Sequence, residues 1–160
     1  MQAPYSIFAS VGNSTQPFDR FVEMVDEATR RTGRRALVQI GSASRRPHNA
    51  DAVDFVTRSE FEELMRAAEH AIVHAGAGSV MMAVQFGKIP IVVPRRKELG
   101  EHVNNHQFEL ASELSRMGWC HVVSNVDELI ECLEAPTAAV PLDGDVTNQR
   151  MRELVTEFIG

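Results

Sequence analysis

The sequence holds few cysteines and few aromatic side chains, and it has no long apolar run. Only two cysteines, one tryptophan and one tyrosine occur in 160 residues. No stretch approaches the ~20 apolar residues that a membrane-spanning helix requires. The N-terminal residues lead straight into the apolar run Tyr5–Val11, which is too short for a signal peptide. We therefore expect reduced thiols at Cys120 and Cys132 and a cytoplasmic location.

Basic residues are outnumbered by acidic ones. The 16 lysines and arginines against 22 aspartates and glutamates give a formal net charge of -6. This balance argues against the broad basic surface of nucleic-acid binders, so we expect no nucleic-acid partner. His102 and His106 lie four residues apart, but no third ligand follows at the spacing of a zinc site. We expect no bound metal and no cofactor.

Familiar nucleotide and hydrolase motifs are missing as well. The chain has no G-x-x-x-x-G-K-[ST] sequence, and its first apolar run leads into Gly12-Asn13-Ser14-Thr15 rather than a G-x-G-x-x-G turn. It has no G-x-S-x-G sequence either, which disfavours a serine hydrolase. These absences exclude common phosphate-binding loops but leave other glycine-rich turns open.

Short β-branched runs alternate along the chain with longer stretches of helical period. Most runs are continuously apolar, as expected for strands that are covered on both faces of a parallel sheet. The pattern predicts a single α/β domain over residues 1–160, doubly wound and Rossmann-like, with a mostly parallel sheet. The predicted strands are Tyr5–Val11, Ala36–Ile40, Ala52–Val56, Ala71–His74, Ile89–Val93 and Trp119–Val123.

Helix start and stop signals separate these strands. A first helix follows Pro17 and ends at Gly33. A capping box of Ser59 and Glu62 predicts the start of the second. The remaining helices are predicted from Ser79 to Phe86, from Asn104 or Asn105 to Gly118, from Asn125 past Leu133, and over residues 147–159 after a loop at Pro136–Gly144.

The segment from His74 to Ser79 has the composition of a diphosphate-binding loop. Gly76 and Gly78 remove side chains where a ligand must approach the backbone, and the N-terminus of the next helix offers unpaired N–H groups. The Ser79 hydroxyl adds a further hydrogen-bonding group. Taken alone, the spacing fits a tight turn without a ligand equally well, and His74 is then a strand-end residue packed against the loop.

A second polar segment runs from Pro94 to Gln107, after a strand that is predicted to be buried. Its Asn, Gln and His side chains are suited to sugar hydroxyls, and its arginines to negative groups. A solvated loop is the alternative for this segment by itself. Because the carboxyl ends of parallel strands share one edge of a sheet, this segment, the glycine segment and the polar turn at Gly12–Thr15 together predict a site there.

The stretches HAGAGSV and GKIPIVVPRRKELGEHVNNHQFELASEL resemble the C-terminal domain of glycosyltransferase family 28. That domain is the donor-binding half of the GT-B fold. The likeness is greatest to stand-alone small subunits, such as the catalytic subunit of the dolichol-linked chitobiose transferase and bacterial exopolysaccharide glucuronosyltransferase subunits. It extends from the turn after the first strand to about Glu134.

The resemblance implies an inverting transferase that uses a UDP-sugar and a polyprenyl-linked acceptor. It places the uracil near residues 56–58 and the sugar at Asn105, His106 and Gln107. The implied diphosphate-binding residues lie in the first turn and in the glycine segment; they are Gly12, Asn13, Ser14, His74, Gly76, Ala77, Gly78 and Ser79.

Other residues of the polar segment suggest further roles. Glu101 and His102 are the local candidates for the base that deprotonates the acceptor. Arg95 and Arg96 could pair with a uronic acid carboxylate, which favours a glucuronosyl donor, or could belong to a solvated loop. One departure from the family concerns Met82, because many members carry there an acidic residue that binds the ribose hydroxyls, and a methionine cannot accept those hydrogen bonds.

A GT-B enzyme needs two such domains, and this chain provides one. The resemblance therefore implies an acceptor-side subunit, anchored in the membrane, that recruits the chain to the inner face of the membrane. The amphipathic segment 147–159 is the candidate docking element. We expect a UDP-sugar-binding catalytic subunit in exopolysaccharide or glycan synthesis; the alternative, motivated by Met82, is a non-catalytic subunit that binds nucleotide or stabilises its partner.

Overall fold

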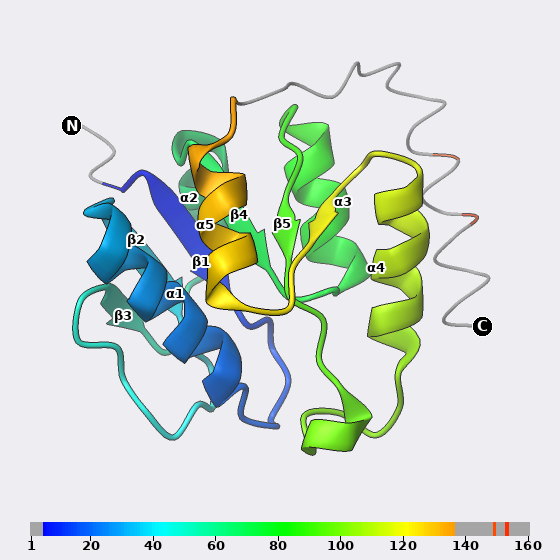
Figure 1. The fold of residues 1–160 in the computed structure, drawn as a ribbon, viewed down its shortest axis with the longest axis horizontal. Helices are drawn as coiled ribbons and strands as arrows, with labels where there is room; N and C mark the ends of the chain where they lie inside the picture. Colours follow the sequence, from blue (N-terminus) through cyan, green and yellow to red (C-terminus); the bar gives the residue numbers. More distant parts are fainter. Residues whose placement is uncertain (1–4, 137–148, 150–152, 154–160) are drawn as a thin grey trace.

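A computed structural model describes residues 5–136 together with Gln149 and Glu153. Strands alternate with helices along the chain, as predicted, except that no helix separates the second strand from the third (Figure 1). The strands are β1 Ile7–Ser10, β2 Ala36–Gln39, β3 Asp51–Val53, β4 His70–Val73, β5 Ile91–Val92 and β6 His121–Val122. The helices are α1 Asp19–Thr32, α2 Arg58–Ala67, α3 Ala77–Gln85, α4 His106–Arg116 and α5 Val126–Glu134, with a short 3-10 helix at Lys97–Leu99.

The strands form a six-stranded sheet in the order β3-β2-β1-β4-β5-β6, and each neighbouring pair is parallel. Ile7 of β1 is opposite Ala36 of β2 on one side and His70 of β4 on the other. The chain builds outwards from β1 to β3, returns to the centre at β4, and then builds outwards to β6. The predicted doubly wound α/β class is confirmed, and the strand order reverses between β1 and β4.

Helices cover both faces of the sheet (Figure 1). One face packs against α1 and α5, where Phe21 and Val25 of α1 and Leu129 of α5 are fully buried. The other face packs against α2, α3 and α4 through residues such as Met65 and Leu114. Cover on both faces explains why the central strands are mostly apolar, since a strand in this position has no solvated side. Their buried polar residues, Ser10, Gln39 and His70, lie at strand ends.

Most helix ends lie where the sequence predicted them, with two differences. Gly33 ends α1 with φ of 70°, and Asn125 caps α5 by accepting the Glu128 N–H at 2.9 Å. The predicted Ser59 box is wrong, because α2 begins earlier: the Thr57 hydroxyl accepts the Glu60 N–H at 3.2 Å. Helix α3 also begins earlier than predicted, at Ala77, so that the second half of the glycine segment is helical.

The predicted C-terminal helix at 147–159 lies outside the described residues, apart from Gln149 and Glu153. These two are helical and exposed, and the Gln149 amide donates to the Glu153 carboxylate at 3.4 Å.

Among the helices that the structure describes, none is both long and apolar enough to cross a membrane. The two edge strands of the sheet are short, with three residues in β3 and two in β6.

Candidate functional site

The turns after β1 and β4 meet at the point where the strand order reverses. The His74 N–H donates to the Ser10 carbonyl at 3.2 Å, and the Gly12 N–H donates to the Ser10 hydroxyl at 3.1 Å. The buried Gln39 side chain, at the end of β2, donates to the same hydroxyl at 3.2 Å and to the Gly12 carbonyl at 3.4 Å. Ligands of doubly wound folds bind in the crevice at this point.

His74 fills the space between the two turns. A Cβ atom on Gly12 would lie 2.2 Å from His74 Nε2, and one on Gly76 would lie 2.2 Å from His74 Cε1, so both positions must be glycine while the ring occupies this place. Gly12 also has φ of 82°, a conformation that other residues rarely adopt. The glycines of the two predicted segments thus share one neighbour.

The imidazole of His74 is neutral at physiological pH. Burial, and next the nearby Arg95 charge, lower its pKa to about 4, against the opposing effect of a hydrogen bond with the Gln107 side chain. Its Nδ1 atom is buried and has no hydrogen-bond partner among the described residues. A ring in this state adds no positive charge to the crevice but holds polar nitrogens beside the glycine segment.

The remaining glycine-segment residues form the first turn of α3. Gly76 is the N-cap residue and has no side chain to satisfy the free N–H groups, and Ala77, Gly78 and Ser79 follow it in the helix. No acidic residue occurs in this first turn. A Cβ atom on Gly78 would meet no described atom within 4 Å, so the backbone is open to an approaching ligand there. The helix terminus favours an anion through its N–H groups and its dipole.

A hollow of about 380 Å³ lies on one side of the α3 N-terminus. Val56, Thr57 and Arg58 line it, as the resemblance placed them, together with Gly78 and Ser79 and with Gly12, Asn13, Gln39, Phe61 and Met82. The side-chain oxygen Oε1 of Gln39 accepts the Val56 N–H at 3.2 Å and so links the two sides of this hollow. Asn13 is exposed at its rim, while the Ser14 hydroxyl accepts the Gln16 N–H at 3.1 Å.

A second hollow, of about 270 Å³, lies beside the same helix terminus. Its lining combines Ala75, Gly76 and Ala77 with His102, Asn104, His106, Gln107 and Leu110. The predicted sugar-binding residues His106 and Gln107 and the predicted base His102 therefore share this hollow. His102 Nδ1 accepts the Asn104 N–H at 3.4 Å. Sequence reasoning missed Asn104, although it is part of the same polar run.

Arg95 does not line either hollow. Its side chain is fully buried, and its guanidinium donates to the carbonyls of Val11 at 3.1 Å, Gln16 at 3.0 Å and Glu101 at 3.2 Å. It also lies over the Phe18 ring at 4.7 Å. The prediction that Arg95 contacts the sugar is corrected here: its hydrogen-bonding groups hold the turn after β1 to the loop after β5.

Glu101 is held by Arg20, an arginine that no local motif singles out. Arg20 of α1 donates from Nε and from a terminal nitrogen to the two Glu101 oxygens, both at 2.9 Å, and also donates to the Pro94 carbonyl at 2.9 Å. The Arg96 N–H adds a third bond to the same carboxylate at 3.0 Å. Both oxygens of this buried carboxylate bond to the protein, and Glu101 lines neither hollow, so its predicted role as the base is not favoured.

Two further predicted sugar-binding residues lie away from the second hollow. The Asn105 side chain accepts the Lys97 N–H at 3.0 Å and donates to the Glu98 carboxylate at 2.6 Å. Arg96 lies over the Phe108 ring at 4.6 Å and, with Asn105, lines a separate shallow hollow. These contacts order the loop between β5 and α4 internally, and Gln107 links it to the strand end by accepting the Arg95 N–H at 3.4 Å.

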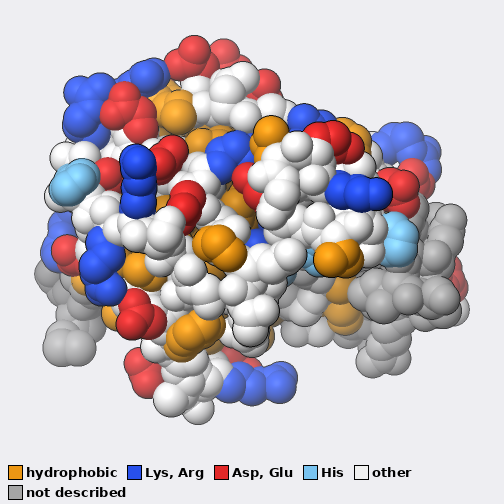
Figure 2. Space-filling model, turned by 90° about the horizontal axis from the view of Figure 1, so that it is seen from below, with side chains coloured by type: hydrophobic (Ala, Val, Ile, Leu, Met, Phe, Trp, Pro, Cys, Tyr) orange, Lys and Arg blue, Asp and Glu red, His pale blue; other side chains and the backbone are white. Residues whose placement is uncertain are grey.

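Figure 2 views the molecule from the end at which these loops lie. Acidic and basic side chains are interspersed around the face, and neither sign dominates it. Within the described part of the chain, no group of three or more histidine, cysteine, aspartate or glutamate residues could hold a metal ion.

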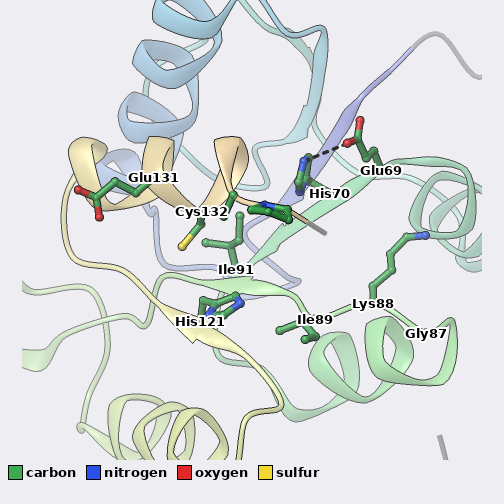
Figure 3. Close-up of a pocket in the computed structure, with 11 residues that line it drawn as sticks. Glu69, His70, Gly87, Lys88, Ile89, Ile91, His121, Glu131 and Cys132 are labelled. Carbon is green, nitrogen blue, oxygen red and sulfur yellow. Dashed lines mark ion pairs between the residues drawn. The ribbon is translucent and has the colours of Figure 1, made fainter. Parts of the chain in front are cut away.

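A hollow of about 380 Å³ also lies at the opposite end of the sheet (Figure 3). His70 and His121 flank Ile91 there, and a Glu69 carboxylate oxygen lies 3.5 Å from His70 Nε2, a contact that is an ion pair only when the ring is protonated. Burial lowers the pKa of His70, which Glu69 only partly opposes. This hollow lies at the amino ends of the strands, whereas ligands of this fold class bind at the carboxyl ends. We therefore assign the candidate site to the two hollows beside α3.

The strand order and the crevice at its reversal define a Rossmann-like domain of the kind found in GT-B glycosyltransferases. The solution structure of ALG13 has a TM-score of 0.62 at 17% identity, covering 92% of this chain and 94% of that one. The crystal structure of Acinetobacter baumannii MurG has a TM-score of 0.58 at 17% identity, covering 97% of this chain but 44% of that one.

The chain belongs to the glycosyltransferase family 28 C-terminal domain, which it matches over residues 6–152. The Yarrowia lipolytica UDP-N-acetylglucosamine transferase subunit ALG13 is 32% identical over 128 residues, covering 72% of this chain and 63% of that protein. The mouse subunit of the same name is 41% identical over 61 residues, 38% of this chain and 5% of that protein. The matches thus span less than two thirds of the curated relatives. The predicted family is confirmed.

Proposed function

We propose that the chain binds a UDP-sugar and acts as the donor-binding subunit of a glycosyltransferase. The observation that carries this proposal is the position of two hollows on either side of one helix N-terminus. In this arrangement the uridine occupies the hollow at Val56–Arg58, the diphosphate lies at Gly76–Ser79, and the sugar occupies the hollow at His106 and Gln107. The free N–H groups of α3 then stabilise the negative charge of the departing UDP.

UDP-N-acetylglucosamine is the donor that we favour. The relatives named above are UDP-N-acetylglucosamine transferase subunits. The case for a glucuronosyl donor rested on Arg95 and Arg96 as partners of a carboxylate. Arg95 is buried with its donors on backbone carbonyls, and Arg96 lies over Phe108 outside the second hollow.

We propose that the acceptor is bound by a second subunit. Glu101 is committed to Arg20, which leaves His102 as the candidate base on this chain. We propose that a membrane-anchored subunit supplies the polyprenyl-linked acceptor and recruits this chain to the inner face of the membrane, in exopolysaccharide or glycan synthesis. Residues 147–159 are the proposed docking element: their deletion should abolish co-purification with the partner and leave the thermal unfolding of the domain intact. A complex that survives the deletion argues against this role.

One observation favours a second candidate, a nucleotide-binding subunit without catalytic residues. Met82 lines the proposed uridine hollow at the position where many family members have an acid for the ribose. Loss of transfer in a His102→Gln variant whose complex and UDP affinity are unchanged would exclude this candidate. Full activity in that variant would assign the base to the partner.

Calorimetric titration tests the donor proposal directly. UDP, UDP-N-acetylglucosamine, UDP-glucuronate and GDP are titrated into the wild-type chain and into Gly78→Ala. The added methyl group meets no described atom within 4 Å and extends into the space along the first hollow, so the variant should fold normally and bind UDP more weakly. Selective UDP binding that Gly78→Ala weakens supports the proposal. Equal affinity for GDP, or no nucleotide binding with or without the partner, would overturn it.

A further inference from the structure

Arg95 is a charged side chain with no exposed surface, placed directly beneath the candidate site. It is fully buried, and its guanidinium bonds to the carbonyls of Val11, Gln16 and Glu101. Val11 precedes Gly12, whose Cα lies against the His74 ring. The Arg95 backbone N–H meets the Gln107 side chain, which also hydrogen-bonds with His74. Arg95 thus bonds directly to the turn after β1 and to the loop after β5. Through Gln107 it is also linked to His74 at the end of β4.

The positive charge of Arg95 is not cancelled by a directly bonded carboxylate. Among the described residues no ion pair includes Arg95, and the carboxylate of Glu101 is bound on both oxygens by Arg20. Arg20, Arg95 and Glu101 together leave one net positive charge. Burial lowers the pKa of Arg95 and Glu101 raises it, but a guanidinium remains protonated at physiological pH.

Burying a charge in this way is expensive unless something compensates for it. Carbonyl oxygens satisfy part of the guanidinium, yet Nε remains buried without a hydrogen-bond partner in the described structure. A methionine of similar length would fill the same space without the free-energy cost of burying a charge. The Arg95 charge acts on His74, which directly precedes the glycine segment, because it lowers the pKa of that ring. The first turn of α3 has no acidic residue, so the helix terminus and Arg95 are two sources of positive potential beside that segment.

We propose that Arg95 supplies a fixed positive charge to a diphosphate at the α3 N-terminus and positions the surrounding loops, without touching the ligand. This inference rests on the proposed binding of a UDP-sugar. Because the charge is shielded from water, its effect on a bound anion is stronger than that of a surface arginine. It also needs no reorganisation, since the guanidinium is already fixed by three carbonyls.

The test compares uridine compounds with no, one or two phosphates, and inorganic pyrophosphate, which has no nucleoside. Uridine, UMP, UDP and inorganic pyrophosphate are titrated into wild type, Arg95→Met and Arg95→Lys at low and high salt. We expect Arg95→Met to weaken UDP binding by about tenfold and uridine binding by less than about twofold. Arg95→Lys keeps the charge and loses the planar fork, so the ratio of UDP to uridine affinity should stay close to that of wild type.

Arg34→Met is the matched control, because Arg34 bonds to the Leu133 carbonyl at 3.0 Å and to the Ser6 hydroxyl at 3.2 Å at the far end of the sheet. It should leave all affinities unchanged. Equal losses of uridine and UDP affinity in Arg95→Met, or the same losses in Arg34→Met, would overturn the proposal. If Arg95→Met does not fold, Arg95→Lys alone decides. A ratio of UDP to uridine affinity about tenfold below that of wild type would then overturn the proposal, because the lysine keeps the charge.

Pyrophosphate separates this proposal from the assignment of the nucleotide. If wild type binds no uridine compound but binds pyrophosphate in a way that Arg95→Met abolishes, the proposed donor is wrong and the role of the Arg95 charge is supported. If wild type binds uridine compounds and the phosphate dependence is the same in Arg95→Met, the donor proposal is supported and the Arg95 proposal is wrong. Hydrogen exchange over residues 96–107 reports the positioning role, since it should increase in Arg95→Met and not in Arg34→Met.

Discussion

Replacing Gly76 by alanine should disturb the protein far more than replacing Gly78, although the two positions are two residues apart. A Cβ atom on Gly76 would lie 2.2 Å from Cε1 of His74, whereas one on Gly78 would meet no described atom within 4 Å. Neither position has a positive φ. The difference between the variants therefore measures the packing of His74 and not a backbone preference.

The size of the effect follows from the space around the ring. Carbon atoms in contact are about 3.5–4.0 Å apart, so the His74 ring must move by more than ~1 Å. It cannot move far towards Gly12, because the ring already occupies the space that a Cβ atom on Gly12 would take, 2.2 Å from Nε2. Overpacking of this kind destabilises by about 1–3 kcal/mol. Gly78 lies inside α3, where alanine is the better helix former, so Gly78→Ala should be neutral or more stable by up to about 1 kcal/mol.

Urea denaturation followed by circular dichroism measures both variants, and His74→Ala supplies the control. With the ring removed, Gly76→Ala should lose most of its effect, giving a coupling free energy of about 1–3 kcal/mol between the two sites. Equal stabilities of Gly76→Ala and Gly78→Ala would refute the reasoning. Additive effects in the double variant would refute it too, because the clash would then not involve His74.

Three other perturbations have defined outcomes. Glu101→Gln leaves half-buried Arg20 without its bidentate partner and should lower the free energy of unfolding by about 1–3 kcal/mol in urea; an unchanged midpoint would contradict this. Burial, and next the Arg95 charge, lower the pKa of His74 from 6.5 to about 4. The stability that the neutral ring contributes is therefore complete above pH 6.5 and is lost as pH falls towards 4. In His74→Gln the midpoint of urea unfolding should depend less on pH across this window. Burial raises the pKa of Asp26, but hydrogen bonds from the N–H groups of His48, Asn49 and Ala50 lower it below 3.8. The stability that its carboxylate contributes is therefore present above that pH and lost beneath it. Asp26→Asn should be less stable than wild type at neutral pH and should lose less stability on acidification.

The strands and the place of the site were predictable because their signals are local. A strand covered on both faces is mostly apolar, and Ile7–Ser10 and His70–Val73 are buried at every position, with Ser10 and His70 as their only polar residues. The loops that follow such strands share one edge of a parallel sheet, so the Gly12 turn and the glycine segment could be placed together without a structure. The position of the second helix was less predictable, because Thr57 with Glu60 and Ser59 with Glu62 both have capping spacing.

The roles of the charged residues were not predictable, since they depend on contacts far apart in the sequence. Arg95 reads as a solvated loop residue, and only the folded chain brings the Val11 and Gln16 carbonyls to its guanidinium. Arg20 and Glu101 are separated by 81 positions, and no local pattern links them. The resemblance implies a diphosphate-binding role for His74, but the contact of its ring with both glycines depends on the pairing of β1 with β4.

The short edge strands bear on how this domain behaves in concentrated solution. An unpaired edge offers N–H and C=O groups on which a strand of another molecule can add, and long edges therefore promote aggregation. Here β3 offers three residues and β6 two, and the β3 edge carries Asp51, which accepts the Tyr5 hydroxyl at 2.7 Å and lies 3.8 Å from Arg35. Neither edge is long enough to template such growth, so changes at β3 or β6 should have little effect on self-association at high concentration.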